Sequence, residues 1–137
     1  MVRPHTFEFI ENISKIYEVI IFTSSAQEYA DNILNKLDPY KKFIRHRLYR
    51  QHVTYENLKK SFKDLSKIGR DLSKVVIVDN LSENFKKQQE NGIKIKTWRN
   101  DLNDKELIKL EMFLKIIADM NCDDIRESIK KISYMLN

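Results

Sequence analysis

Two short apolar runs of the sequence end abruptly in polar side chains. Thr23 and Ser24 follow the run "EVIIF", and Asp79 and Asn80 follow the run "VVIV". A hydroxyl group and free backbone N–H groups just before a helix can bind a phosphate. An aspartate is a hard oxygen ligand suited to Mg²⁺, which usually takes only one or two protein carboxylates. The two run ends therefore indicate an anion site and a metal site.

Each of these residues also has a purely structural interpretation. Ser24 or Ser25 could serve only as the N-cap of the following helix. Asp79 could cap the end of its strand, with Asn80 in a turn. Lys63, in "SFKDLS", could bring a positive charge over the same sheet edge. Because 25 of the 137 residues are lysine or arginine, a surface position for Lys63 is the alternative.

The periodicity of apolar residues predicts helices alternating with short buried strands. The predicted helices cover 4–16, 26–37, 107–117 and 125–136, and the predicted strands cover 18–22, 43–50, 75–79 and 92–98. Residues 51–74 are polar and irregular, with one short helix expected near Leu65. This order is typical of an α/β fold with a parallel sheet covered by helices on both faces. In such sheets ligands bind beyond the carboxyl ends of the strands, where Thr23 and Asp79 are predicted to lie.

Length and composition narrow the class of protein. A chain of 137 residues with 42% hydrophobic and 33% charged residues is typical of one globular domain, here residues 1–137. No apolar run reaches the roughly 18 residues that a membrane span needs, and no signal peptide is visible. The single Cys122 excludes an internal disulfide and fits an intracellular, reducing compartment, cytoplasmic or nuclear.

The net charge of +5 is spread among acidic residues instead of forming one basic block. This pattern favours a solvated surface, and the alternative is that the positive charge attracts phosphates or nucleic acid.

Several ordered segments together resemble one family. The chain is similar to the FCP/SCP-type, NLI-interacting-factor-like and dullard-type protein phosphatases of the haloacid dehalogenase (HAD) superfamily. The resemblance rests on "RPH" (3–5), "YEVIIFTSS" (17–25), "YAD" (29–31), "LD" (37–38), "RHRLYRQH" (45–52), "KDLSKIGRDLSKVVIVDN" (63–80) and "NGIKIKTW" (91–98).

The resemblance implies a role for each candidate residue. Thr23 would bind the transferring phosphoryl group and Lys63 would neutralise it. Asp79 would hold Mg²⁺, with Asn80 supporting the metal site. It further implies that Ser24, Tyr29 and Arg50 lie near a groove for a phosphorylated protein or peptide substrate.

The sequence departs from the family at its most important motif. The family's D-x-D-x-T, which carries the nucleophilic and general-acid aspartates, does not occur, and Asp71, Asp101 and Asp104 lie outside any such pattern. In relatives that motif precedes the "RP" with which this chain begins. We therefore expect an N-terminally truncated domain that is inactive alone and binds Mg²⁺ weakly. "DNLSENF" (79–85) also departs from the usual Asp-Asn-Ser-Pro, and one extra residue between Arg50 and Lys63 weakens the Arg50 assignment.

Two functions remain open on this basis. The first is a fragment of a Mg²⁺-dependent phosphatase that uses an aspartate nucleophile on phosphoserine or phosphothreonine in proteins. The alternative is a non-catalytic interaction module, as in the mitochondrial import-translocase subunit that shares the fold. Retention of Thr23, Lys63, Asp79 and Asn80 favours the first.

The absent motif also predicts a problem in the sheet. In the family the nucleophile strand lies between the strand ending at Thr23 and the strand ending at Asp79. Without it, two rows of backbone groups would lack partners, at a cost on the order of 1–3 kcal/mol per buried group. We expect strands 18–22 and 75–79 to pair directly with each other. The alternative is that the gap between them is filled by another segment of this chain, or by a segment of a second copy in a homo-oligomer.

Overall fold

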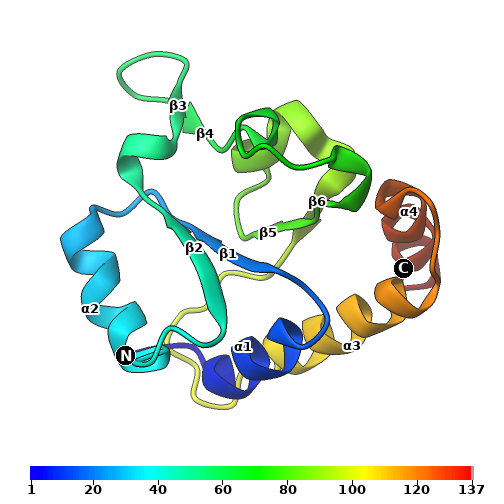
Figure 1. Cartoon of the computed structure of the whole chain (residues 1–137), viewed down its shortest axis with the longest axis horizontal. Coiled ribbons are helices and arrows are strands. Elements are labelled where there is room, and N and C mark those ends of the chain that lie inside the picture. Colours follow the sequence, from blue (N-terminus) through cyan, green and yellow to red (C-terminus); the bar gives the residue numbers. More distant parts are fainter. Residues whose placement is uncertain (137) are drawn as a thin grey trace.

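The computed structural model describes residues 1–136 and arranges their strands in three separate pairs (Figure 1). β1 (Val19–Phe22) lies parallel to β2 (Ile44–Leu48), and β5 (Ile77–Asp79) lies parallel to β6 (Gly92–Lys94). β3 (Thr54–Tyr55) and β4 (Ser61–Phe62) form an antiparallel hairpin that projects from the body of the molecule (Figure 1).

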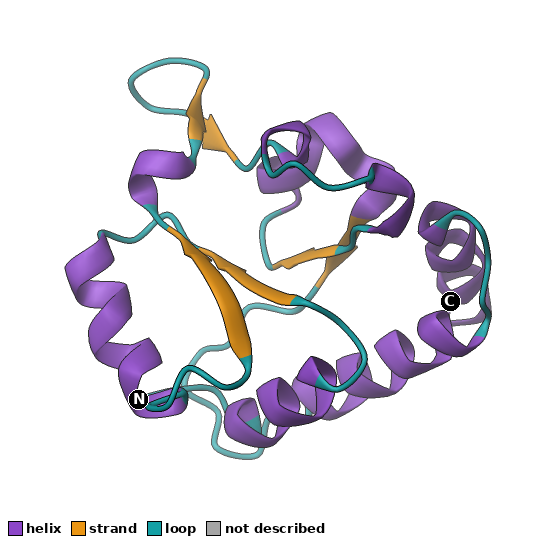
Figure 2. Ribbon diagram, in the orientation of Figure 1, coloured by secondary structure: helices purple, strands orange, loops and turns teal. Residues whose placement is uncertain are grey.

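Helices surround the two parallel pairs, as Figure 2 shows. The α-helices are α1 (Thr6–Ser14), α2 (Gln27–Leu37), α3 (Glu106–Asp119) and α4 (Ile125–Leu136), and the 3₁₀ segments are η1 (Arg50–His52), η2 (Leu65–Lys67), η3 (Leu72–Lys74) and η4 (Ser82–Asn91). All four predicted α-helices are confirmed, and each predicted end lies within about two residues of the observed end. Among residues 1–136, no helix has both the length and the apolar character that crossing a membrane requires.

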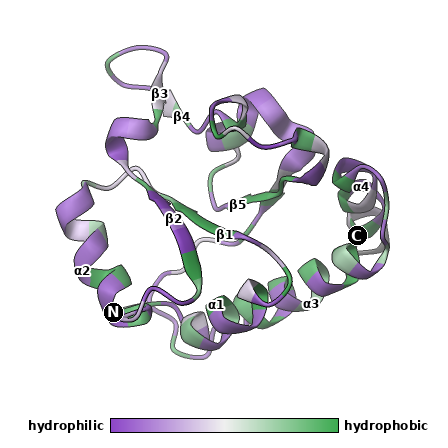
Figure 3. Ribbon diagram, in the orientation of Figure 1, coloured by the Kyte–Doolittle hydropathy of each residue, from purple (hydrophilic) through white to green (hydrophobic). Residues whose placement is uncertain are grey.

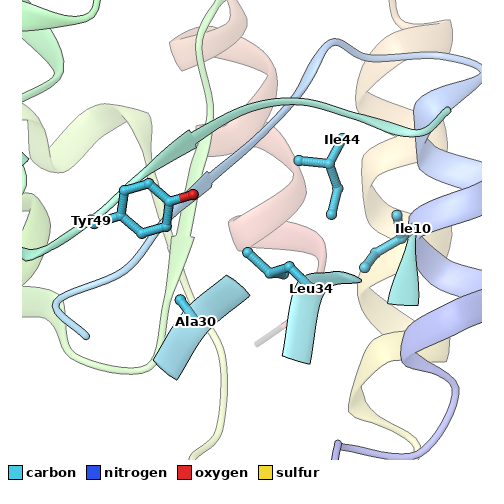
Figure 4. Packing of buried hydrophobic residues seen from close by; sticks show 5 residues of the cluster. All are labelled: Ile10, Ala30, Leu34, Ile44 and Tyr49. Atoms are coloured by element: carbon cyan, nitrogen blue, oxygen red, sulfur yellow. The ribbon is translucent and has the colours of Figure 1, made fainter. Parts of the chain in front are cut away.

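The first hydrophobic cluster joins α1 and α2 to β2. It consists of Ile10, Ala30, Leu34, Ile44 and Tyr49, all at most 7% exposed (Figure 4). Its polar member is satisfied, because the Tyr49 hydroxyl donates to Asp31 Oδ1 at 2.6 Å. This cluster fixes α2 over the β1–β2 pair.

A second cluster connects the two parallel pairs to each other. Ile13 of α1 and Leu110 and Leu114 of α3 are buried, and they pack against Val19 of β1 and Val78 of β5. Ile77 of β5 packs in a third cluster, which it forms with Leu65 of η2 and Phe85 of η4. One helix layer is therefore shared by both pairs, whereas the other faces are covered separately.

The continuous sheet that we expected is not formed. Within residues 1–136, β1 pairs with β2 alone and β5 with β6 alone, so the predicted direct pairing of 18–22 with 75–79 is wrong. A cleft of about 630 Å³ lies between the two strands and is lined by both. Shared packing on α1 and α3 holds both strands in place, and no other segment of the described chain pairs with their free edges.

The irregular region was also predicted incompletely. Residues 54–62 form the β3–β4 hairpin, whose strands of two residues are too short to show alternation in the sequence. Its turn is closed by Asn57, whose side-chain oxygen accepts hydrogen bonds from the N–H groups of Lys59 and Lys60. The helix expected near Leu65 is the short segment η2, and the strand predicted over 92–98 ends at Lys94.

The loop between α2 and β2 depends on one buried carboxylate. Asp38 is 1% exposed and accepts hydrogen bonds from the N–H groups of Lys42, Phe43 and Ile44 at 2.8, 3.1 and 2.9 Å. Burial on its own would raise the pKa of Asp38, but these backbone hydrogen bonds outweigh it and hold the pKa below the ordinary value of 3.8. Asp38 thereby sets where β2 begins.

We predict that Asp38→Ala lowers the free energy of unfolding by on the order of 3 kcal/mol, because three backbone donors lose their acceptor. The stabilisation by Asp38 is present at neutral pH and is lost as the pH falls through its lowered pKa, so the difference between wild type and variant narrows in acid. Urea unfolding across this pH range measures both effects. Exposed Asp123 provides the control, and an equal loss in Asp123→Ala would contradict the prediction.

Candidate functional site

A buried ion pair lies at the carboxyl end of β5. Lys63 Nζ donates to Asp79 Oδ2 at 2.6 Å, and the two side chains are only 9% and 6% exposed. Lys63 follows β4 directly and Asp79 is the last residue of β5. Two charges so far from water persist only when they are paired and their remaining hydrogen bonds are made. The surface alternative for Lys63 is therefore wrong.

Asn84 of η4 holds both members of this pair and was missed by the sequence analysis. Its side-chain nitrogen donates to Asp79 Oδ1 at 3.1 Å, and its carbonyl accepts from the N–H of Lys63 at 2.8 Å. Asp79 Oδ1 also accepts from the N–H of Leu81 at 2.9 Å. The available signal was the polar segment that follows the strand, but nothing in its spacing says that the chain turns back toward Lys63.

The loop after β1 continues the hydrogen bonding to β2 by one residue. The N–H of Thr23 donates to the carbonyl of Leu48 at 2.9 Å, and Thr23 Oγ1 accepts from the N–H of Ser25 at 3.0 Å. α2 begins only at Gln27, and its N-cap is Ala26, without a side-chain capping bond. Capping of α2 is therefore not the role of Ser24 or Ser25, and Thr23 Oγ1 serves as a hydrogen-bond acceptor within this loop.

The two strand ends lie at one edge of the molecule. Lys63 Nζ is 5.8 Å from the ring centroid of Phe22, the residue before Thr23. The structure thus brings Lys63 and Asp79 to the neighbourhood of the Thr23 loop, although these residues come from segments far apart in the sequence. This edge collects a cation, a carboxylate and a hydroxyl, which is the set of groups that a phosphate ester site uses.

The three residues predicted to contact the substrate do not all lie together. Arg50 lies against the loop after β1, since its Nε donates to the carbonyl of Ser24 at 3.1 Å and its N–H donates to the carbonyl of Ser25 at 3.0 Å. Ser24 itself is exposed. Tyr29 is 65% exposed on α2. Arg50 and Ser24 therefore form one surface, with Tyr29 on the adjacent helix.

A divalent cation is implied by the family resemblance, and the residues at this edge do not form a site for it unaided. Asp79 is the one carboxylate bonded to Lys63, and its two oxygens are engaged by Lys63, Leu81 and Asn84. The side chain of Asn80 donates to Thr97 Oγ1 at 3.2 Å. Through residue 136 no group of three or more His, Cys, Asp or Glu side chains is arranged to hold a metal ion.

We predict that Lys63→Met lowers the free energy of unfolding by about 3–5 kcal/mol, because it leaves the Asp79 carboxylate buried without its counterion. Adding Asp79→Leu removes the unpaired buried charge. The double variant should therefore lose clearly less unfolding free energy than the sum of the losses in the two single variants. Urea unfolding of the complete cycle measures the coupling. Lys86→Met, which breaks a partly exposed pair with Glu56, is the control and should change stability much less. Additive losses at residues 63 and 79 would contradict the coupling.

Comparison with known proteins places these features in a family. The profile described as "NLI interacting factor-like phosphatase" matches residues 1–126. The CTD small phosphatase-like protein 2 of Dictyostelium discoideum is 46% identical over 128 residues, which are 93% of this chain and 22% of that protein. The CTD small phosphatase-like protein 3 of Caenorhabditis elegans is 43% identical over 130 residues, which are 93% of this chain and 44% of that protein.

Two further similarities complete the comparison. The mitochondrial import inner membrane translocase subunit tim50 of Aspergillus fumigatus is 40% identical over 93% of this chain and 25% of its own length. The solved structure of Fcp1, described as an essential RNA polymerase II CTD phosphatase, has a TM-score of 0.76 at 20% identity and covers 99% of this chain and 50% of that one. That likeness confirms the HAD-like α/β fold.

The chain spans less than half the length of each of these curated relatives. The profile match, however, extends over nearly all of its residues. The chain therefore belongs to the NLI interacting factor-like phosphatase family.

Proposed function

We propose that this chain supplies the phosphate-binding side of a Mg²⁺-dependent phosphatase domain that acts on phosphoserine or phosphothreonine in proteins. The observation that carries the proposal is the meeting of Lys63, Asp79 and the Thr23 loop at one edge, where buried Lys63 bonds one carboxylate oxygen of Asp79. We further propose that residues 1–137 form a single domain whose nucleophilic aspartate comes from a segment outside this chain.

In this proposal the residues have distinct tasks. The Thr23 hydroxyl donates to a phosphoryl oxygen, and the Lys63 ammonium cancels part of the negative charge that develops during transfer. Asp79 and Asn80 contribute to the cation side, whereas Ser24, Arg50 and Tyr29 contact the peptide around the phosphorylated residue. Mg²⁺ is proposed as the cofactor of the completed domain only, because Asp79 alone does not make a site for it.

The other aspartates support the proposal that the nucleophile is external. Asp71 caps η3 by accepting from the N–H of Ser73, and Asp101 accepts from the N–H of Asn103. Asp104 forms a two-pronged ion pair with Arg3, at 2.8 and 2.9 Å. Each carboxylate is engaged in local structure, and none of them is bonded to Lys63.

The alternative is a protein-interaction module without catalysis. Two observations favour it: the 40% identity to a translocase subunit, and the saturation of Asp79 by protein donors. The two proposals differ in one measurable property. A phosphatase-derived site recognises the phosphate group of a peptide, whereas an interaction module binds the peptide irrespective of phosphorylation.

We predict that a phosphoserine peptide binds more tightly than its unphosphorylated counterpart and that Thr23→Val reduces this preference by about ten-fold, through loss of one hydrogen bond to a charged acceptor. Titration calorimetry with both peptides measures the preference. Thr54→Val is the matched control, since the Thr54 hydroxyl in β3 accepts a hydrogen bond from Lys67 Nζ and makes no bond to the Thr23 loop. Equal affinities for the two peptides would favour the interaction module.

Catalysis gives a separate prediction. The chain alone should not hydrolyse p-nitrophenyl phosphate in millimolar Mg²⁺, because in this proposal the carboxylate that forms the phospho-aspartyl intermediate comes from outside the chain. The rate of p-nitrophenol release by the wild-type chain should equal the rate measured with the Asp79→Ala variant within experimental error. Turnover by the wild type that Asp79→Ala abolishes would show that this chain carries its own nucleophile.

A further inference from the structure

The β3–β4 hairpin connects the two halves of the candidate site. Before β3, Arg50 bonds the loop after β1, because its N–H donates to the carbonyl of Ser25 at 3.0 Å and its Nε to the carbonyl of Ser24 at 3.1 Å. Directly after β4, Lys63 bonds Asp79 at 2.6 Å. Both legs of the hairpin therefore start at the site, and its turn stands away from the body of the molecule, as Figure 1 and Figure 3 show.

Contacts with η4 hold the hairpin in place. Lys86 Nζ of η4 donates to Glu56 Oε2 at 2.7 Å and lies 5.0 Å from the ring centroid of Phe62, which is buried. Within the hairpin, the N–H of Glu56 donates to the carbonyl of Lys60 at 2.9 Å. The turn is therefore ordered before any ligand arrives, which lowers the entropic cost of binding there.

The hairpin tip, residues 55–60, combines apolar and positively charged side chains. All of its residues are exposed, among them Tyr55, Leu58, Lys59 and Lys60. Both lysines lack an ion pair among residues 1–136, whereas Glu56, the one acidic residue of the tip, is paired with Lys86. Single exposed apolar residues are common, but an aromatic and an aliphatic side chain beside two unpaired cations form a surface that fits an acidic peptide.

We propose that the hairpin tip binds an acidic stretch of the same polypeptide that carries the phosphorylated residue. This inference rests on the proposed function, because Lys63 at the foot of β4 must hold the phosphate. Lys60 precedes Lys63 by three residues and Leu58 by five, which corresponds to about 10 and up to about 16 Å along an extended leg. A substrate extended along this leg therefore carries its acidic residues three to five positions from the phosphorylated one.

An acidic membrane surface is a poorer occupant of the hairpin tip. Adsorption to lipid requires a broad basic and apolar face, and Glu56 and Asn57 interrupt such a face at the tip. A polypeptide that is already bound through its phosphate near Lys63 needs only a small second contact, because that contact forms within one complex. The start of both hairpin legs at the site therefore favours the phosphorylated polypeptide.

The test measures the binding of fluorescein-labelled phosphoserine peptides to the full chain by anisotropy. One peptide carries glutamates at the third to fifth positions from the phosphoserine, the other carries glutamines there, and each is made with this stretch on either side. We expect the glutamates to tighten binding about ten-fold in at least one direction. The double variant Lys59→Gln with Lys60→Gln should abolish this gain, and Leu58→Ser should reduce it. All three side chains are exposed, so we expect the variants to fold.

The matched control is Lys130→Gln with Lys131→Gln, which removes the same charge from the exposed side of α4 and should keep the gain. Equal loss in both double variants, or no gain in either direction, would overturn the inference while leaving a preference for phosphate intact. A gain without any preference for phosphate would instead refute the proposed function and keep the tip as a site for acidic peptides. Sedimentation with phosphatidylserine vesicles, lost in the double variant at 59 and 60 and without a gain for either peptide, would assign the tip to a membrane surface and overturn the inference.

Discussion

The packing of Ile13, Leu110 and Leu114 against both parallel strand pairs is the constraint on which the rest of the structure depends. These three side chains, each at most 5% exposed, contact Val19 of β1 as well as Val76 and Val78 next to and within β5. Two strand pairs that share no backbone hydrogen bond are thereby held side by side with their carboxyl ends at one edge. This shared layer thereby contributes to the fixed relation between the segments that carry Thr23 and Asp79.

The charged residues at that edge are held in place by polar contacts from η4. η4 folds back so that Asn84 contacts both Lys63 and Asp79, while Gln88 donates to Asp64 and accepts from the N–H of Leu65. The segment from Lys63 to Leu65 is therefore fixed by two residues of η4, through the backbone carbonyl of Asn84 and the side chain of Gln88. The ammonium group of Lys63 is buried at the carboxyl end of β5, and its pairing with Asp79 allows it to remain there.

The relatives of this chain include proteins named as phosphatase-like and proteins named as import-translocase subunits. One fold can host both, because activity depends on the groups placed at the strand ends and not on the arrangement of helices and strands. In this chain the cation and the carboxylate at the strand ends are present, and an apolar cleft lies between β1 and β5 beside them. The fold therefore combines two adjacent features, a charged edge and an apolar cleft.

The sequence by itself determined the α-helices, the apolar strands and the polar residues at the strand ends, because each follows from local periodicity and from side-chain chemistry. It also identified Thr23, Lys63 and Asp79 as candidates, first from their chemistry near the strand ends and then from the family resemblance. Only the tertiary structure decided that Lys63 is buried against Asp79 and that Asn84 supports both, since these contacts join residues whose spacing carries no signal. It likewise decided that β1 and β5 stay apart, because the helix layer beneath them, and not their own apolar pattern, determines where each strand lies.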